Sequence, residues 1–348
     1  MAVIMKKIMK FKKLAPGEHE KIGYFFIVPA VLFMFIFVGY PIFYNVLLSF
    51  YKVDLRSLNT GVSEFVGLAN YKALFAPGTN TIKVISNTLF FTVICLIFQF
   101  TIGFLFDLFF NLEFKLAKVV RGLIMVAWLV PITVTALNFK FMFSERGGII
   151  NQILLSMNLL KEPLAWLVGK NSAMWSVIIT NVWIGIPFNM ILLVTGLSTI
   201  SPSLYESSNI DGANWFQKLF YITIPSIKPA IYSCLTLGFI NTFKVFDLIF
   251  MMTNGGPVDA TEVLSTLSYR YSFDKFNYSM GATVADVLCI ILLIVSYFYI
   301  RNIGKDSGRI LIIYLISGVG TVLGGITGFF LLKDFIPQLS NIAPMFVG

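Results

Sequence analysis

The chain has 348 residues, of which 57% are apolar and 12% are charged, and its formal net charge is +9. So large an apolar fraction excludes an ordinary soluble globular protein and predicts a membrane protein. The basic residues cluster in short segments beside apolar runs, as they do at the cytoplasmic ends of membrane helices. This placement argues against nucleic-acid binding as the meaning of the positive charge.

Cysteine and histidine usage argues against metal or nucleophilic chemistry. Cys95, Cys234 and Cys289 each lie inside an apolar run, so they are expected to be small buried hydrophobic residues without a disulfide framework. The single histidine, His19, lies in the charged amino-terminal segment, so a catalytic centre built on histidine is not expected. The sequence therefore predicts no catalytic residue and no metal site, and a membrane enzyme is a distant alternative.

Six apolar stretches before residue 301 are long enough to cross a bilayer, which takes about 20 residues. They are residues 24–50, 84–111, 119–143, 172–200, 230–252 and 280–300. The first follows a basic stretch, as a signal peptide would, but it is too long for a signal core and is expected to remain as an anchor. The sequence thus predicts an all-α membrane protein, with a cytoplasmic segment over 1–23 followed by a transmembrane domain over 24–305.

A further segment, 306–348, contains a seventh apolar stretch at 310–332 and is expected to add a carboxy-terminal hydrophobic helix and a tail. Gly320, Gly324 and Gly328 recur every fourth residue there, so on a helix they would form a smooth stripe that lets another helix approach closely. A loosely packed anchor that faces lipid is an equally good interpretation.

The lysines and arginines orient the chain in the membrane. With the amino terminus in the cytoplasm, the segments on the cytoplasmic side hold fourteen basic residues, and the longer segments outside hold nine. Because cytoplasmic loops carry the excess of positive charge, we predict a cytoplasmic amino terminus. The connection between the fourth and fifth stretches then lies in the cytoplasm.

That connection contains a polar passage, residues 205–225, which reads YESSNIDGANWFQKLFYITIP. Just before it, Ser201 and Pro202 are suited to begin a short helix. Gly212 permits a backbone turn that a residue with a side chain would resist. The passage is therefore expected to open with a short helix that ends in a turn.

A second helix is expected over residues 213–223. Trp215, Leu219 and Ile222 are spaced for one face of it, and Pro225 is expected to end it. Two short helices at an angle predict a rigid cytoplasmic loop. A simple connector lying on the membrane surface is the alternative that the physical pattern leaves open.

The spacing within this passage resembles the EAA loop of membrane permease subunits of bacterial ABC importers. That motif reads E-A-A, three residues, G, nine residues, I-x-L-P, and the chain keeps this spacing throughout. It departs from the motif in having serines for both alanines and isoleucine for the leucine. The resemblance assigns contact with an ATPase to the following residues: Glu206, Ser207, Ser208, Asp211, Gly212, Ile222 and Pro225.

Three other segments resemble the sugar-importer permeases similar to the maltose system. They are FVGLANYKALF at 65–75, WIGIPF at 183–188 and TNGGP at 253–257. The resemblance covers about residues 20 to 305 and implies a six-helix type I ABC importer core, with the coupling loop at 201–228. The stretch after Ser307 departs from the family pattern.

The same resemblance implies a substrate pathway lined by the fourth and fifth stretches. The matching positions are Trp183, Ile184, Gly185, Phe188, Gly238, Asn241, Thr242 and Val245. Gly185 and Pro187 are expected to loosen the fourth helix and to expose backbone carbonyl groups. Binding by the partner subunit alone is the alternative.

Five charged residues lie inside or near the stretches: Asp107, Lys140, Lys244, Asp247 and Asp286. Charged groups in membrane helices are functional candidates. Lys244 and Asp247 are three apart and would neutralise each other on one helix, whereas the other three lie near helix ends, where they can reach polar surroundings. A structural role is favoured for the set.

The resemblance also implies partners. They are a second permease subunit, two ATP-binding cassette subunits, an external sugar-binding protein and the lipid of a bacterial cytoplasmic membrane. The chain holds no G-x-x-x-x-G-K-[ST] loop, so it is expected to bind no cofactor, with ATP and Mg²⁺ on the ATPase subunits. Polyamine, glycerol-phosphate and nucleoside-type cargoes remain open. A proton-coupled secondary transporter that uses Asp107 or Asp286 is the alternative.

Overall fold

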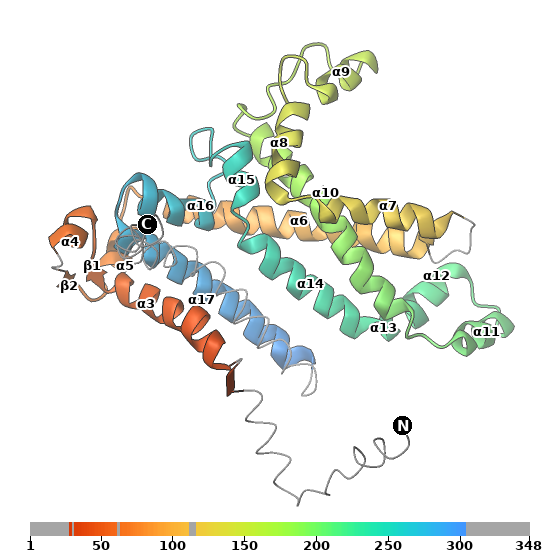
Figure 1. Cartoon of the computed structure of the whole chain (residues 1–348). Coiled ribbons are helices and arrows are strands. Elements are labelled where there is room, and N and C mark those ends of the chain that lie inside the picture. The colour runs from red at the N-terminus through yellow and green to blue at the C-terminus, as the bar shows by residue number, and fades with distance from the viewer. Residues whose placement is uncertain (1–27, 30, 61–62, 111–115, 304–348) are drawn as a thin grey trace, which may run out of the picture.

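The computed structural model describes residues 28–29, 31–60, 63–110 and 116–303. The predicted cytoplasmic segment 1–23 and the predicted carboxy-terminal helix, with Gly320, Gly324 and Gly328, lie outside these residues. The described chain is helical apart from one pair of two-residue antiparallel strands, in which Tyr51 pairs with Phe65. The all-helical expectation therefore holds for the spans (Figure 1).

The first half of the described chain forms these elements: η1 (Phe35–Gly39), α3 (Tyr40–Ser49), β1 (Tyr51–Lys52), α4 (Leu55–Thr60), β2 (Glu64–Phe65), α5 (Ala69–Leu74), α6 (Thr81–Phe110), α7 (Ala117–Leu129), α8 (Ile132–Met142) and α9 (Ile149–Ser156). The second half forms α10 (Ser172–Leu197), α11 (Pro202–Ile210), α12 (Trp215–Lys218), η2 (Leu219–Thr223), α13 (Ile224–Ser226), α14 (Lys228–Phe243), α15 (Asp247–Met252), α16 (Leu264–Tyr269), η3 (Arg270–Asp274) and α17 (Tyr278–Ile303). The elements labelled η are π-helical turns.

Four stretches of the described chain are long and apolar enough to cross a membrane as single helices: Val31–Ser49, Thr81–Phe110, Ser172–Leu197 and Tyr278–Phe298. They correspond to the predicted first, second, fourth and sixth spans. The predicted third and fifth spans are each divided in two, so the expectation of one continuous helix is wrong for both.

The division of the third span follows from proline chemistry. Helices α7 and α8 meet at an angle of 97° across Val130 and Pro131. Proline disfavours the helical conformation in the residue before it and lacks an N–H group. Val130 is accordingly extended, with φ −73° and ψ 131°, and the chain turns there.

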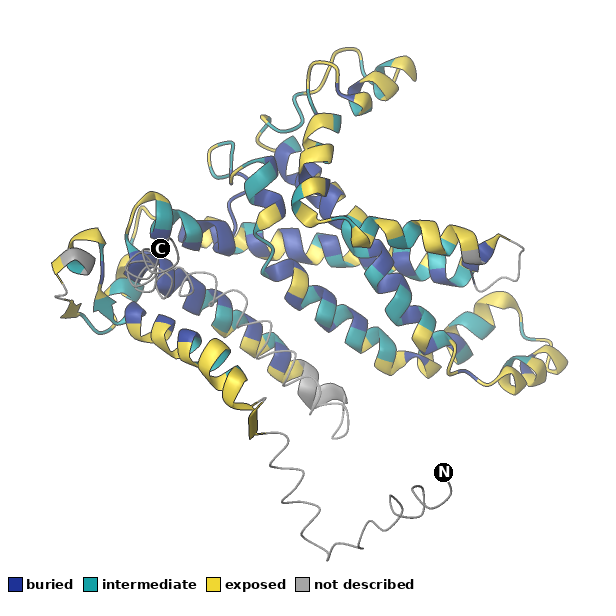
Figure 2. Cartoon of the chain, viewed as in Figure 1, coloured by how far each residue is buried: buried dark blue, intermediate teal, exposed yellow. Residues whose placement is uncertain are grey.

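The helices pack as two neighbouring groups (Figure 1). Helices α6, α10 and α14 pack against one another, and α7 lies against α10. Helix α3 packs along α17, which also contacts α14 and α16. Large apolar side chains on the outer faces of α3 and α7 are exposed (Figure 2), as expected for surfaces that meet lipid or another membrane helix.

A buried polar network holds α3, α5 and α17 together. Asn45 Nδ2 donates to Asp286 Oδ1 over 2.9 Å, and the Tyr71 hydroxyl donates to Asp286 Oδ2 over 2.9 Å. Burial raises the pKa of Tyr71 to about 12, so this hydroxyl keeps its proton. Asn70 Nδ2 donates to the carbonyls of Ser49 and Tyr51 just beyond α3. The FVGLANY segment therefore fastens the first span to the last.

This network supports the structural interpretation of Asp286. A second of the five charged residues, Lys140, also has a structural contact, because its Nζ donates to the Met251 carbonyl over 3.0 Å and joins α8 to α15. Asp107 lies one turn before the end of α6 but is buried, with no described partner at Oδ2, so the expectation that it reaches polar surroundings does not hold within the described residues.

We expect Tyr71→Phe to reduce the free energy of unfolding by about 1–3 kcal/mol, because a buried carboxylate then loses a donor. The measurement is the melting temperature of the detergent-purified protein. Tyr40→Phe is the matched control, since the Tyr40 ring is exposed on α3. Equal melting temperatures for the two variants would contradict the structural role of Tyr71.

Candidate functional site

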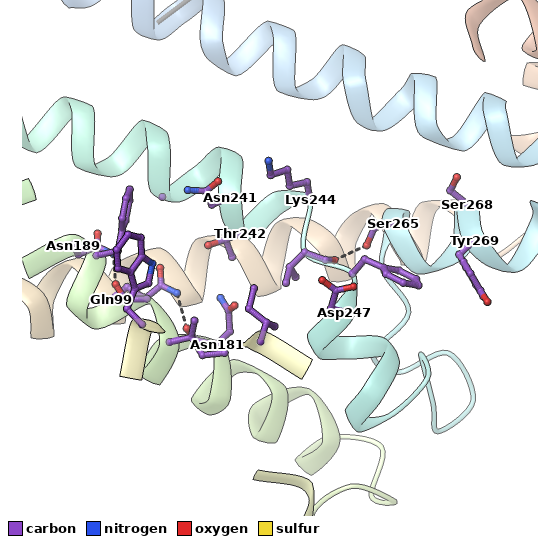
Figure 3. A pocket seen from close by; sticks show the side chains of 18 of the residues that line it. Gln99, Asn181, Asn189, Asn241, Thr242, Lys244, Asp247, Ser265, Ser268 and Tyr269 are labelled. Atoms are coloured by element: carbon purple, nitrogen blue, oxygen red, sulfur yellow. Dashed lines mark hydrogen bonds between the residues drawn. The ribbon is translucent and has the colours of Figure 1, made fainter. Parts of the chain in front are cut away.

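A cavity of about 770 Å³ opens between α6, α10, α14 and α16 (Figure 3). Its walls combine aromatic rings with uncharged polar groups and one charged pair. The lining residues are Gln99, Trp128, Ile132, Asn181, Ile184, Gly185, Phe188, Asn189, Gly238, Asn241, Thr242, Lys244, Val245, Phe246, Asp247, Ser265, Ser268, Tyr269 and Phe273. Such a mixture suits a ligand that offers both apolar faces and hydrogen-bonding groups.

One side of the cavity is formed where the predicted fifth span breaks, between the end of α14 and the start of α15. The Ser265 hydroxyl of α16 donates to the Val245 carbonyl over 2.6 Å and so satisfies a backbone group that the break releases. Within a membrane, non-helical backbone is tolerated only where it is buried in protein or lines a cavity. The break and the cavity therefore depend on each other.

The break also corrects the expectation for Lys244 and Asp247. Lys244 ends α14 and Asp247 begins α15, so the two residues do not occupy neighbouring positions on one helix. Figure 3 shows their side chains directed to different sides of the break. Their spacing of three in the sequence does not describe their relation in space.

A wall of side-chain amides faces this break from α6 and α10. Gln99 Nε2 donates to the Asn181 carbonyl over 2.9 Å, and its side chain fills the space beside Gly185, where an added Cβ would lie 2.3 Å from it. Asn189 Nδ2 donates to the Gly185 carbonyl over 2.8 Å. Helix α10 continues through Pro187, so the expected loosening does not interrupt it.

Aromatic rings lie at both ends of the cavity. Trp128 and Phe188 have ring centroids 6.2 Å apart, and Phe246 and Tyr269 have centroids 5.0 Å apart. Trp183, in contrast, is half exposed and lies against Phe139 outside the cavity lining. Stacking on a flat apolar face is available at either end.

The structure brings seven of the eight predicted pathway residues to this cavity, all except Trp183. Their role in transport stays a prediction. Sequence reasoning missed the amides Gln99, Asn181 and Asn189, although polar residues inside apolar spans were a usable signal. It also missed the α16 residues Ser265 and Tyr269, because that segment was expected to be an external loop.

The external turn at TNGGP is built around two carboxylates and one arginine. Arg270 lies 2.8 Å from Asp259 and 2.5 Å from Glu262. Burial raises the pKa of Glu262, and the arginine opposes that effect. Gly255 has φ +78°, and a Cβ there would meet the Glu262 carboxylate at 2.2 Å. The glycine of this motif is therefore required by close packing as well as by backbone conformation.

The loop between α10 and α14, which the sequence predicts to be cytoplasmic, has the predicted form of two short helices with a turn between them. Gly212 follows α11 with φ +74°, a conformation that favours glycine, and the space around it is open. Asn214 caps α12 through a capping box with Gln217. The second helix runs through η2 and α13, past Pro225, and ends at Ser226, so Pro225 does not end it.

The loop presents an unusually apolar outer surface for a segment beyond the spans. Ile210 is 88% exposed and Tyr221 is 80% exposed, while Trp215, Phe216 and Phe220 are more than half exposed. Among the predicted coupling residues, Glu206, Ser207, Asp211, Gly212 and Pro225 are also exposed, whereas Ser208 is buried and Ile222 half-buried. Exposed apolar residues of this kind are typical of a surface that contacts another protein or the membrane.

The loop is mechanically continuous with two walls of the cavity. Helix α10 leads into α11, and α13 leads into α14. The Tyr205 and Thr223 hydroxyls bond across the loop over 2.8 Å. A Cβ added to Gly196 would lie 2.6 Å from the Ala230 Cβ, so α10 and α14 are in contact directly above the loop. The loop and the adjoining ends of both helices therefore form one connected, packed unit.

The family model described as "binding-protein-dependent transport system inner membrane component" matches residues 99–304, and the chain belongs to this family. It is thus a multi-pass membrane protein and a permease component of ABC transporters, not an enzyme. A second model, described only as a protein of unknown function (DUF819), matches residues 273–348.

Relatives and a solved structure agree with this assignment. The chain is 29% identical to the trehalose/maltose transport system permease protein MalF of Thermococcus litoralis, over 82% of this chain and 94% of that protein. It is 28% identical to the diacetylchitobiose uptake system permease protein DasB of Streptomyces coelicolor, over 82% and 87%, and 32% identical to the probable ABC transporter permease protein YurN of Bacillus subtilis, over 84% and 99%. A chain of a bacterial ABC transporter involved in alginate import shares the fold, with a TM-score of 0.68, 23% identity and coverage of 82% and 98%. The resemblance inferred from the sequence is confirmed.

The proton-coupled alternative is not supported. Asp286, one of its two candidate carboxylates, is occupied by hydrogen bonds from Asn45 and Tyr71. Family membership assigns the chain to ABC transport instead.

We expect Gly196→Ala to reduce the free energy of unfolding by about 1–3 kcal/mol, because α10 and α14 must separate to admit the methyl group. Gly122→Ala on α7 is the matched control, since the space beside Gly122 is open and alanine favours a helix by up to about 1 kcal/mol. Melting of the purified protein measures both effects. If Gly196→Ala is as stable as Gly122→Ala, the close contact of the two helices is not formed.

Proposed function

We propose that this chain forms one half of the pathway of an ATP-driven importer for a sugar, most simply an oligosaccharide. The observation that carries the proposal is the direct continuity between the cavity walls α10 and α14 and the exposed cytoplasmic loop. A force applied at the loop would move the helices that surround the cargo. The protein would lie in the cytoplasmic membrane with its amino terminus inside.

The chemistry of the cavity supports a sugar cargo. Sugar rings offer apolar faces that stack on aromatic side chains and hydroxyl groups that bond to amides. The cavity offers rings such as Trp128 and Phe188, and amides such as Asn241 and Asn189. Relatives named for trehalose/maltose and diacetylchitobiose transport suggest the same class of cargo.

Three kinds of partner protein would complete the transporter. The exposed apolar patch of the loop, including Ile210, Trp215 and Tyr221, would dock into separate ATPase subunits that bind ATP and Mg²⁺. A second permease would close the open side of the cavity. A binding protein would deliver cargo at the opposite end of α10, near α9 (Figure 1).

Cross-linking tests the docking surface. We expect a cysteine introduced as Ile210→Cys to capture the ATPase subunit in membranes, because that side chain is 88% exposed on the loop. Val168→Cys is the control, since Val168 is 70% exposed beyond the other end of α10. The native Cys95 and Cys234 are buried and should not react, whereas Cys289 is only half-buried, contrary to expectation, and is replaced by alanine in both variants. Failure of loop cysteines to capture an ATPase would refute the proposed docking.

Gly212→Asp tests coupling. Aspartate at φ +74° strains the turn by roughly 1–2 kcal/mol, so we expect the protein to insert while ATP hydrolysis no longer drives uptake. Gly78→Asp is matched to it, with φ +90° and open space in a segment away from the loop, and should leave coupling intact. The measurement is uptake per ATP hydrolysed in proteoliposomes. Normal uptake by the Gly212 variant would count against the loop as the coupling element.

A further inference from the structure

One carboxylate of the cavity is left available for a ligand. Asp247 begins α15 at the break, is exposed, and lines the cavity. Within the described part of the chain, no hydrogen bond or ion pair engages its carboxylate. Figure 3 shows it beside the Val245 to Ser265 bond, with Tyr269 on the neighbouring helix α16. The carboxylate oxygens of Asp247 are therefore free of the described chain and open to a hydrogen-bond donor that enters the cavity.

The charges around the cavity are few. Among the described residues that line it, only Lys244 and Asp247 are charged, and the other polar side chains carry amides, hydroxyls or, in Trp128, an indole N–H. Lys244 is directed to the other side of the break (Figure 3). The next cation, Lys140, donates to the Met251 carbonyl and does not line the cavity. Asp247 is therefore the one charged side chain that the described lining presents on its side of the break.

We propose that Asp247 selects the cargo by accepting hydrogen bonds from hydroxyl groups of an uncharged sugar, and that it rejects uronate sugars. This inference rests on the proposed sugar-import function and narrows the class of its cargo. A carboxylate only accepts hydrogen bonds, and sugar hydroxyls can donate them. The Tyr269 and Phe246 rings beside it supply the apolar surface on which a sugar ring can stack.

Repulsion between like charges explains why uronate sugars would be rejected. A uronate carboxylate placed near Asp247 would bring two negative charges within a few ångströms of each other, and like charges at that distance repel. Building an unfavourable charge contact against the wrong ligand is an effective source of specificity. The fold alone does not decide whether the cargo is neutral or acidic, because a chain with the same fold belongs to a transporter of the acidic polysaccharide alginate.

The test is equilibrium dialysis of the complete transporter in nanodiscs, without binding protein, against maltotriose, diacetylchitobiose and trigalacturonate. We expect a neutral probe to bind and trigalacturonate to bind at least about tenfold more weakly. Asp247→Asn should weaken neutral binding by roughly 10- to 100-fold, as for a lost hydrogen bond to a charged group. Asp247→Lys should reverse the preference toward trigalacturonate. Asp274→Asn, the same change at an exposed residue outside the cavity lining, should have no effect.

Four results would overturn the proposal. In the unmodified transporter, trigalacturonate binds as well as the neutral sugars, or no neutral sugar binds. In Asp247→Asn, the affinity for neutral sugars is unchanged. Finally, Asp247→Asn loses the partner permease, while the complexes that remain bind neutral sugars with unchanged affinity. The last would make Asp247 a subunit contact.

Stimulation of ATP hydrolysis by sugar-loaded binding protein separates this inference from the proposed function. If only uronate cargo stimulates ATP hydrolysis, the chain is still part of a sugar importer, but the proposed preference for uncharged sugars is wrong. If no sugar stimulates ATP hydrolysis, the proposed sugar-import function is wrong.

Discussion

The structure depends on the rule that backbone N–H and C=O groups inside a bilayer must be paired within the protein. The break between α14 and α15 is the exception that this rule permits, because it lies against a cavity and the Ser265 hydroxyl bonds to the Val245 carbonyl. The sharp bend at Pro131 turns α8 toward α15, and Lys140 closes the contact at the Met251 carbonyl. Two broken spans thus border a polar cavity, and side chains from other segments bond to the Val245 and Met251 carbonyls beside it.

Close contact between α10 and α14 links this cavity to the loop between the two helices. At Gly196 the two helices approach too closely for a side chain, and below that point each runs directly into the loop. The Tyr205 to Thr223 bond holds the two halves of the loop together. The loop and the cavity walls are therefore parts of one packed unit, which gives a mechanical reason for a polar passage between two apolar spans.

The first and last spans serve a different purpose. Asp286, a charged residue inside a span, is explained by its hydrogen bonds to Asn45 and Tyr71 and needs no catalytic or proton-carrying role. The segment around Tyr71, which resembles a family motif, links α3 to α17 through hydrogen bonds from Asn70 and Tyr71. A buried carboxylate satisfied by neutral donors can thus be structural, whereas Asp247 has no such donors among the described residues.

The sequence by itself determined the class of the protein and located the polar loop between α10 and α14, because apolar length, charge placement and the spacing from Glu206 to Pro225 are local properties. It also located most of the pathway residues, since their motif positions fall on two spans. Only the tertiary structure decided that the fifth span breaks, that α16 reaches the cavity and that Lys244 and Asp247 point apart. These features depend on which side chains from distant segments pair with exposed backbone groups, and neither hydropathy nor spacing along the chain carries that information.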